Sequence, residues 1–330
     1  MFLLAGGLLA TTLLIAAGNA AHAVKPRVGF VAYSGSQPTP RTLDGLALLG
    51  FVRAEQKLPI RARVRYVGPT QSPGPVLASF AREDYDLVVA PLFNLGPLGP
   101  LSRRFPRVQF VVIDWQPGAP PQRRKKNIHR TVFRAEEAGY LAGYLAALMV
   151  ERKGPRSMIS AVGGLPYYGV TRWIVGYRAG ALKADPQIRI RVDYSGDFAN
   201  PAKCRRVALS QIAAGSRVVF DVAGACGVGA LQAAHAKHVW GVGVDVDQSF
   251  LGSHILTSAV ARFDRGVFDI VRRRVQGKLT PGSTTVYNVR NRGVELGRIS
   301  PKVPKRFLRK LEHIRRQIAD GTITVPRPKH

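Results

Sequence analysis

The chain has 330 residues, and its 49 Lys and Arg outnumber its 20 Asp and Glu to give a formal net charge of +29. Hydrophobic residues make up 46% of the chain and charged residues 21%, which is enough for a core and excludes a disordered basic tail or a histone-like filament. Two cysteines exclude a Cys₄ zinc site and a disulfide-dense scaffold, and the length allows roughly two domains of ~150 residues.

The first expected element is an export signal over residues 1–23. Residues 2–17 form an uncharged apolar run, and the Ala-His-Ala tripeptide at 21–23 is typical of a signal-peptidase site. The run is short for the alternative, a transmembrane anchor, which needs about 20 residues. No Lys or Arg precedes it, which leaves a misplaced start codon open. We expect an exported protein of residues 24–330, in the periplasm or at the outer face of the plasma membrane. It is not lipidated through a cysteine, because none lies near the cleavage site.

The first half of the body alternates apolar runs with segments of helical spacing. We expect strands at residues 28–33, 61–66, 86–90 and 108–113, and helices at 42–56 and 134–150. In the second of these helices, Gly139 and Gly143 lie four residues apart and therefore on one face. Small residues there allow a neighbouring element to approach closely.

The same pattern then restarts. We expect strands at residues 157–162, 188–194, 217–222 and 239–244, and helices at 171–184, 201–214 and 227–237. Alternating strands and helices predict parallel sheets with right-handed crossovers. Two series of similar length favour an α/β fold of two doubly wound lobes, and a (β/α)₈ barrel is the architectural alternative. Residues 302–316 then predict a basic amphipathic helix that turns inward Phe307, Leu308, Leu311 and Ile314.

Carboxylates follow two of the expected buried strands. Asp114 follows strand 108–113, and Asp245 and Asp247 follow strand 239–244. In open α/β sheets, ligands bind beyond the carboxyl ends of the strands, where a carboxylate can accept hydrogen bonds from ligand hydroxyls. For Asp114 and Asp245 we expect ligand contact, whereas Asp247 fits a capping role equally well.

Sequence motifs for catalysis, metal binding or nucleotide binding do not stand out. The glycines of residues 224–229 do not follow the order of a nucleotide-binding loop. Close approach of the backbone to a ligand would explain these glycines as well as nucleotide binding would. The histidines have no metal-binding spacing, and no nucleophile elbow occurs. We expect neither a cofactor nor a metal. The two cysteines, Cys204 and Cys226, form either one disulfide, which an exported protein would retain, or two buried thiols.

Six short motifs together resemble those of one family of binding proteins. They lie at residues 133–143 (FRAEEAGYLAG), 176–181 (GYRAGA), 194–198 (YSGDF), 211–215 (QIAAG), 243–248 (GVDVDQ) and 256–258 (LTS). In this order and spacing the chain resembles the BMP (basic membrane protein) or PnrA-like family, the substrate-binding proteins of ABC transporters. The resemblance covers nearly all of residues 27–325 and is strongest between 130 and 260.

The resemblance implies a type I periplasmic-binding-protein fold, whose two lobes close over a ligand at a hinge that the chain crosses three times. We accordingly expect an N-terminal lobe of residues 24–132 plus 249–285 and a C-terminal lobe of residues 133–248 plus 286–330.

Family members bind purine nucleosides and hand them to a membrane permease, so the resemblance also implies a ligand site. The base would stack between aromatic rings, and the ribose hydroxyls would meet carboxylates. Carried over residue by residue, Phe198 stands where a stacking ring is expected, and Gly224 and Asp245 stand at ligand-facing turns. Asp114 ends a strand of the first lobe, as in related sugar-binding folds.

The first lobe departs from the family pattern. The family's Phe becomes Leu43, its Asn becomes Asp44, an earlier Asp falls near Ser34, and a Lys is replaced by Ala261 with Arg262 beside it. A leucine loses a ring-on-ring contribution of ~0.5–1.5 kcal/mol. An aspartate lacks the amide donor of asparagine. These changes keep the binding-protein assignment and weaken the purine nucleoside assignment.

Our leading hypothesis is an extracytoplasmic, non-enzymatic solute-binding protein of an ABC importer, with a small ligand in its inter-lobe cleft. A ligand sensor or regulator of the same fold without a transporter is one alternative. A secreted nucleoside hydrolase that uses Asp114, Asp245 and Asp247 is another, although no base or metal set accompanies these carboxylates.

The positive charge gathers in basic runs at residues 123–126, 272–274 and 302–316. None matches a known nucleic-acid reading module, so we expect no specific nucleic-acid partner. Adhesion to an anionic membrane or cell-wall surface is the expected consequence. The codon habits of a GC-rich genome are an alternative origin of the arginines.

Overall fold

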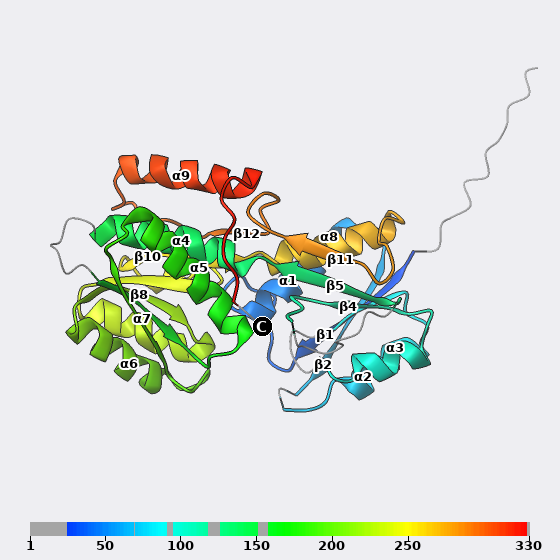
Figure 1. Cartoon of the computed structure of the whole chain (residues 1–330). Helices are drawn as coiled ribbons and strands as arrows, with labels where there is room; N and C mark the ends of the chain where they lie inside the picture. Colours follow the sequence, from blue (N-terminus) through cyan, green and yellow to red (C-terminus); the bar gives the residue numbers. More distant parts are fainter. Residues whose placement is uncertain (1–24, 69, 91–94, 118–125, 151–157, 329–330) are drawn as a thin grey trace, which may run out of the picture.

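The computed structural model describes residues 25–68, 70–90, 95–117, 126–150 and 158–328. The expected export signal and most of the basic run at 123–126 lie outside the described residues. Within the described ranges, the chain forms two separate six-stranded sheets in two lobes that lie side by side (Figure 1), so the barrel alternative is wrong.

The first lobe is a parallel sheet in the order β2-β1-β3-β4-β5-β11. Its strands are β1 (Arg27–Tyr33), β2 (Arg61–Val67), β3 (Leu87–Val89), β4 (Gln109–Val112), β5 (Ile128–Phe133) and β11 (Thr284–Tyr287). Helices α1 (Leu43–Lys57) and α8 (Phe263–Val275) cover one face, and α2 (Gly74–Arg82) and α3 (Leu98–Arg104) cover the other (Figure 1). Since side chains alternate along a strand, Phe30 of β1 packs with α1 while Val31 packs toward α2.

The second lobe repeats this plan in the order β7-β6-β8-β9-β10-β12, with only the edge strand β12 antiparallel among its described strands. Its strands are β6 (Met158–Gly163), β7 (Arg189–Tyr194), β8 (Ser216–Val222), β9 (Trp240–Asp245), β10 (Ile255–Ala261) and β12 (Val294–Leu296). Its helices are α4 (Ala135–Val150), α5 (Tyr168–Ala184), α6 (Pro201–Ala213), α7 (Gly227–Ala236) and α9 (Lys305–Asp320). Two short 3₁₀ turns, η1 (Gly224–Cys226) and η2 (Ser249–Leu251), follow β8 and β9.

The described chain passes between the lobes three times: from β5 to α4, from β10 to α8, and from β11 to β12. This is the three-segment hinge of a type I periplasmic-binding-protein fold. One detail of the expected lobe division is wrong. Strand β10 hydrogen-bonds β9 and β12 in the second sheet, so residues 255–261 do not lie in the N-terminal lobe. The chain returns to the first lobe only after β10, at α8.

Helices α4 and α5 cross with their backbones in direct contact. The contact is made by four glycines, two on each helix: Gly139, Gly143, Gly176 and Gly180. A Cβ at Gly143 would overlap the Tyr177 carbonyl oxygen, and a Cβ at Gly180 would overlap that of Tyr140. The close approach expected at Gly139 and Gly143 is confirmed, and the element that approaches is α5.

One cluster of buried apolar side chains runs through both lobes. It contains Phe51 and Val111 of the first lobe, Phe220 and Leu256 of the second, and Leu145 of α4. Smaller clusters lie under α2 and α3 in the first lobe and under α6 and α7 in the second.

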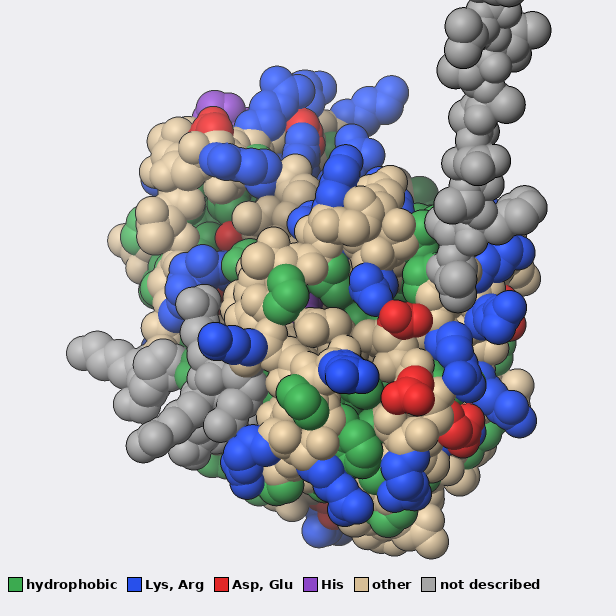
Figure 2. Space-filling view, turned by 90° about the vertical axis from the view of Figure 1, so that its right-hand side faces the viewer, with side chains coloured by type: hydrophobic (Ala, Val, Ile, Leu, Met, Phe, Trp, Pro, Cys, Tyr) green, Lys and Arg blue, Asp and Glu red, His purple; other side chains and the backbone are tan. Residues whose placement is uncertain are grey.

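The amphipathic helix near the C-terminus is confirmed as α9, which packs on the outer side of α4 (Figure 1). Phe307, Leu311 and Ile314 are buried, whereas Leu308 is exposed, because the inward stripe follows the spacing 307, 311, 314 and 318. Figure 2 shows Lys and Arg side chains spread over the first-lobe end of the molecule, with few Asp or Glu among them. Over the described residues, no helix combines the length and the apolar character needed to cross a membrane.

Candidate functional site

The two sheets place the ends of several loops together between the lobes. Each sheet reverses its strand order after its first strand, between β1 and β3 in the first lobe and between β6 and β8 in the second. Loops at the carboxyl ends of strands diverge at such a switch point and leave room for a ligand. The loop after β6 leads into α5, which reaches across to the end of β4.

Asp114 and Arg172 form a buried ion pair that joins the lobes at this point. Asp114 follows β4 with a left-handed φ of 54°, which aspartate tolerates. Its Oδ1 accepts hydrogen bonds from Arg172 Nη1 at 3.0 Å and from the Phe133 amide at 3.3 Å, and Arg172 Nη2 contacts Oδ2. Arg172 Nη1 also donates to the Phe133 carbonyl at 3.2 Å. Burial opposes the charge of Arg172, but Asp114 keeps the pKa of the guanidinium above its ordinary value.

Asp245 lies beside this pair, at the end of β9 and with a left-handed φ of 63°. Burial raises the pKa of its carboxyl group to about 6, while Arg172 favours the charged form and Asp114 opposes it. Burial raises the pKa of Tyr167, and the charge of Asp245 acts in the same direction. The two carboxylates expected to contact a ligand are therefore brought together. Asp114 is held by Arg172, whereas Asp245 forms no ion pair with another described residue.

Two aromatic rings of the second lobe pack together, and one of them, Tyr167, responds to the charge of Asp245. The Tyr167 and Phe198 rings lie 5.7 Å apart between centroids, edge to face, and Tyr167 is 47% exposed. The Phe198 ring packs against Gly164, where any Cβ would overlap it. Gly224 has a left-handed φ of +56°, and a side chain there would begin 3.3 Å from the Phe198 carbonyl oxygen. Gly164 and Gly224 therefore leave space for the Phe198 side chain.

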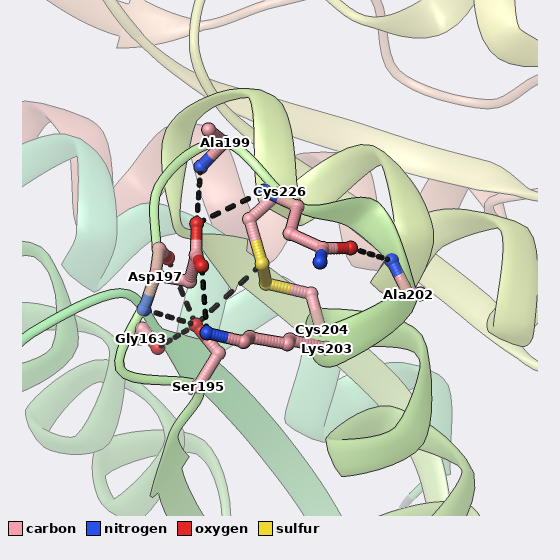
Figure 3. The surroundings of a disulfide bond; sticks show 9 residues. Gly163, Ser195, Asp197, Ala199, Ala202, Lys203, Cys204 and Cys226 are labelled. Carbon is pink, nitrogen blue, oxygen red and sulfur yellow. Dashed lines mark hydrogen bonds and ion pairs between the residues drawn. A yellow bond between two sulfur atoms is a disulfide. The ribbon is translucent and has the colours of Figure 1, made fainter.

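The backbone around Phe198 is fixed by a disulfide and a polar turn (Figure 3). Cys204 of α6 is joined to Cys226 of η1, with Cα atoms 5.5 Å apart, and the Cys226 amide donates to the Phe198 carbonyl at 3.0 Å. On the other side of Phe198, Asp197 accepts hydrogen bonds from the amides of Ala199 and Asn200 and pairs with Lys203. Of the two alternatives for the cysteines, the structure shows the disulfide.

Removing the disulfide by Cys204→Ala/Cys226→Ala should lower the free energy of unfolding by about 3 kcal/mol, because the bond closes a loop of 22 residues in the unfolded chain. Urea denaturation would measure the loss. A reducing agent should lower the midpoint of the wild type to that of the variant and leave the variant unchanged. A wild-type midpoint that does not respond to reduction would contradict the expectation.

Asp221 is a second buried carboxylate of this lobe. It lies on β8 with no exposed surface, and Gly227 is required beside it because a Cβ there would overlap Oδ1. Neither carboxylate oxygen meets hydrogen-bond geometry with another described residue. Burial, assisted by the charge of Asp245, raises the pKa of Asp221 to about 7 against the lowering effects of the Ala223 backbone and the Gln248 side chain.

Asp221→Asn should therefore change how stability depends on pH. In the folded state Asp221 keeps its proton up to a pKa of about 7, whereas the unfolded chain releases it near 3.8. Its stabilising contribution is present below the lower value and is lost as the pH rises through the higher one. The stability of the variant relative to the wild type should grow by about 2–4 kcal/mol between about pH 4 and 8, in urea denaturation. The exposed Asp84→Asn control should follow the wild type, and parallel curves for Asp221→Asn would contradict the assignment.

Two of the expected ligand residues have hydrogen-bond partners within the protein. The carboxylate of Asp247 accepts hydrogen bonds from the amides of Ser249 and Arg298, both at 3.1 Å, while Gln248 occupies the N-cap position of the short helix η2. The guanidinium of Arg262 binds Asp264 through two nitrogens and Glu295 through a third, which leaves it little freedom to meet a ligand.

The expected first-lobe residues lie on the loop and helix after β1. Ser34 is exposed directly after the strand, and its amide donates to the Val67 carbonyl at 2.8 Å. Leu43 begins α1 and packs partly against the main core. Asp44 lies in the first turn of α1, where burial raises its pKa.

Three residues of the site were not expected from the sequence: Tyr167, Arg172 and Asp221. A signal existed for Arg172, since it stands four residues before Gly176 and so shares the face of α5 that crosses α4. An arginine on such a face needs a buried partner. Asp221 lies within β8, one residue before its end, and its carboxylate is buried, whereas Asp114 lies after the end of β4.

Comparison with known proteins gives a consistent result. A family model described as "ABC transporter substrate-binding protein PnrA-like" matches residues 50–329. Among curated relatives, the ABC transporter nucleoside-binding protein BmpA of Lactococcus lactis subsp. cremoris is 30% identical over 243 residues. The alignment spans 68% of this chain and 66% of that protein, so this chain matches about two thirds of its length.

Solved structures show the same fold. A solute-binding protein of an ABC transporter system from Aeropyrum pernix K1 superposes with a TM-score of 0.76 at 22% identity, over 92% of this chain and 94% of that one. One from Conexibacter woesei DSM 14684 superposes with a TM-score of 0.73 at 22% identity, over 92% and 99%. At this identity the similarity establishes the two-lobed architecture.

Proposed function

This chain belongs to the PnrA-like family of ABC transporter substrate-binding proteins, and from that premise we propose that it captures a small ring-containing solute between its lobes for an ABC permease. One observation carries the proposal. Beyond the strands of the second sheet, Tyr167 contacts the ring of Phe198 and is close enough to Asp245 for that carboxylate to raise its pKa, and Asp245 in turn responds to the ion pair that joins the lobes. An aromatic corner offers a face to a planar ring, and a carboxylate that is not already paired offers an acceptor to hydroxyl or amino groups.

The proposed ligand is nucleoside-like, and its sugar is contacted differently from the family pattern. A relative named as a nucleoside-binding protein supports the class. In this chain Asp114 is held by Arg172, so Asp245 is the proposed acceptor for ligand hydroxyls. Leu43 replaces a ring in the first lobe, so Phe198 and Tyr167 supply the stacking surface.

The test is a thermal-shift screen of nucleosides, free bases, sugars and polyamines, followed by calorimetric titration of each hit. A true ligand at 100 times its Kd stabilises the folded state by ~2.7 kcal/mol. Phe198→Ala and Asp245→Asn should each weaken the hit at least tenfold. Asp247→Asn is the matched control two residues away, and it should keep the affinity because that carboxylate already holds two backbone amides.

Two outcomes would contradict the proposal. The first is a screen in which none of these solutes stabilises the protein at millimolar concentration. The second is a hit whose affinity falls equally in Asp245→Asn and Asp247→Asn, since that would place the ligand elsewhere.

We propose binding without turnover. Catalysis by a carboxylate pair would need Asp114 or Asp247 beside Asp245, and both are held by hydrogen bonds of their own. Incubation of the protein with a nucleoside hit should leave the nucleoside intact by liquid chromatography. Release of free base that is lost in Asp245→Asn would instead favour the hydrolase alternative.

We also propose an exported protein held at the anionic envelope by its charge. The net charge of +29 and the basic first-lobe end support this (Figure 2). Washing envelopes with ~0.5 M salt, where the Debye length shrinks to a few ångströms, should release the mature protein. Retention at that salt concentration would favour an uncleaved anchor.

A further inference from the structure

A second cavity lies on the first lobe, away from Tyr167, Phe198 and Asp245. It has a volume of about 530 Å³, and its walls come from α1, α8, β11 and the crossing segment that follows β11. The helices approach closely at one end of it, because a Cβ at Gly50 of α1 would overlap the backbone of Asp264. Beyond this contact they present their side chains to a common space. A space of this size holds a small molecule.

The walls of this cavity are strongly basic. Its charged lining residues comprise one carboxylate and five cations: Asp269, Arg53, Lys57, Arg265, Arg272 and Arg273. Helix α1 contributes Arg53 and Lys57, four residues apart and therefore on one face. Like charges on neighbouring helices repel each other unless an anion lies between them.

Partners within the protein account for only part of this charge. Arg272 and Arg273 both pair with Asp269, and Arg53 lies 3.5 Å from the buried Asp264. Lys57 is exposed and makes no ion pair with the described residues. Arg265 donates to the Arg292 carbonyl at 3.2 Å and forms no ion pair with the part of the chain that the structure describes.

The position of Arg265 is informative. It lies in the first turn of α8, where the positive end of the helix dipole disfavours a cation. Lys57 lies in the last turn of α1, where the negative end of the helix dipole favours a cation. Helix electrostatics therefore explain Lys57 but not Arg265, and an anion in the cavity would favour both.

We propose that this cavity binds a phosphate-bearing anion. Guanidinium groups match phosphate oxygens with paired hydrogen bonds, and several of them converge here with an ammonium group. Phe268, Val286 and Tyr287 line the same cavity, so an apolar part of the ligand can also be covered. The phosphate can come from a soluble compound or from a lipid headgroup, and the two sources share this chemistry. The site is separate from the proposed solute site and does not depend on it.

The first arm of the test uses inorganic pyrophosphate as the probe. Lys57→Ala/Arg265→Ala removes two cations of the cavity, neither of which pairs with a carboxylate among the described residues. Arg309→Ala/Lys310→Ala removes the same charge from the exposed side of α9. In calorimetric titrations at constant ionic strength, we expect the cavity variant to bind pyrophosphate at least tenfold more weakly than the wild type. The control should bind within twofold of the wild type.

Lys57→Gln, at the exposed end of α1, is a second variant that spares the packing of α8.

The second arm distinguishes the lipid source. Vesicles of phosphatidylglycerol and phosphatidylcholine are sedimented with each protein at ~0.15 M salt. A larger loss of vesicle binding in the cavity variant than in the charge-matched control would assign the site to a lipid phosphate. Equal losses of vesicle binding, together with weaker pyrophosphate binding in the cavity variant alone, would assign it to a soluble phosphate. The proposal is overturned if the two double variants behave alike in both arms, or if the wild type binds neither probe.

Discussion

Replacing Gly143 with alanine should destabilise the protein by about 3 kcal/mol or more. The new Cβ would overlap the Tyr177 carbonyl oxygen, which is backbone and cannot rotate away as a side chain could. Helices α4 and α5 would have to separate, and the apolar side chains between them would lose contact. Overpacking of a core typically costs about 1–3 kcal/mol, and a backbone clash lies at the upper end of that range. Urea denaturation would measure the change.

Gly99→Ala is the matched control for this prediction. Gly99 also lies in a helix, α3, but an ideal Cβ there meets nothing within 4 Å. The alanine should be neutral or stabilising by up to about 1 kcal/mol, because it favours helix and restricts the unfolded chain. Gly180→Ala should repeat the Gly143 result from the α5 side. Equal small effects at Gly99 and Gly143 would mean that the helices are not in backbone contact.

Arg172→Met should cost about 3–5 kcal/mol, since it leaves the carboxylate of Asp114 charged, nearly buried and without its partner. The Phe133 carbonyl would lose a donor as well. Methionine keeps the length and apolar stem of the arginine, so the loss reports on the charge rather than on packing. The pair joins the two lobes, and denaturation curves would measure the loss at neutral pH.

The double variant Asp114→Asn/Arg172→Met separates the ion pair from other effects. Asparagine accepts the left-handed backbone at this position and can still accept from the Phe133 amide. It should recover at least 1 kcal/mol relative to Arg172→Met alone. Arg316→Met, which breaks an exposed pair with Glu312, should cost less than about 1 kcal/mol. Additive losses in the double variant would show that Asp114 does not depend on Arg172.

Strands with continuous apolar runs were predictable, because burial on both faces of a parallel sheet leaves a local signature. Strands β4 and β9 lie within one or two residues of the expected ranges. Strand β5 was not expected, since His129, Arg130 and Thr131 interrupt its apolar residues. These side chains are buried nonetheless, because distant groups satisfy them. The ring nitrogens of His129, for example, lie 3.0 Å from the hydroxyls of Ser283 and Thr285.

Site residues that are positioned by a neighbouring strand could be predicted from the sequence, whereas residues positioned by distant parts of the chain could not. Asp245 ends β9 and Phe198 lies four residues after β7, and Tyr167 links them, since its ring contacts Phe198 and its pKa responds to the charge of Asp245. Asp247 and Arg262 also follow strands, but their partners Arg298 and Glu295 are distant in the chain and could not be predicted from the local sequence. The interlobe pair could not be derived from either lobe alone, since its partners are 58 residues apart.

The core cluster that contains Phe51, Leu145 and Phe220 crosses the boundary between the sheets. The fold has two lobes, but this cluster joins apolar side chains of both lobes through α4. On the face of each sheet that this cluster covers, neither lobe therefore has a core of its own. The two lobes should consequently lose structure in a single cooperative transition. A lobe expressed by itself would expose an apolar face and be prone to aggregate.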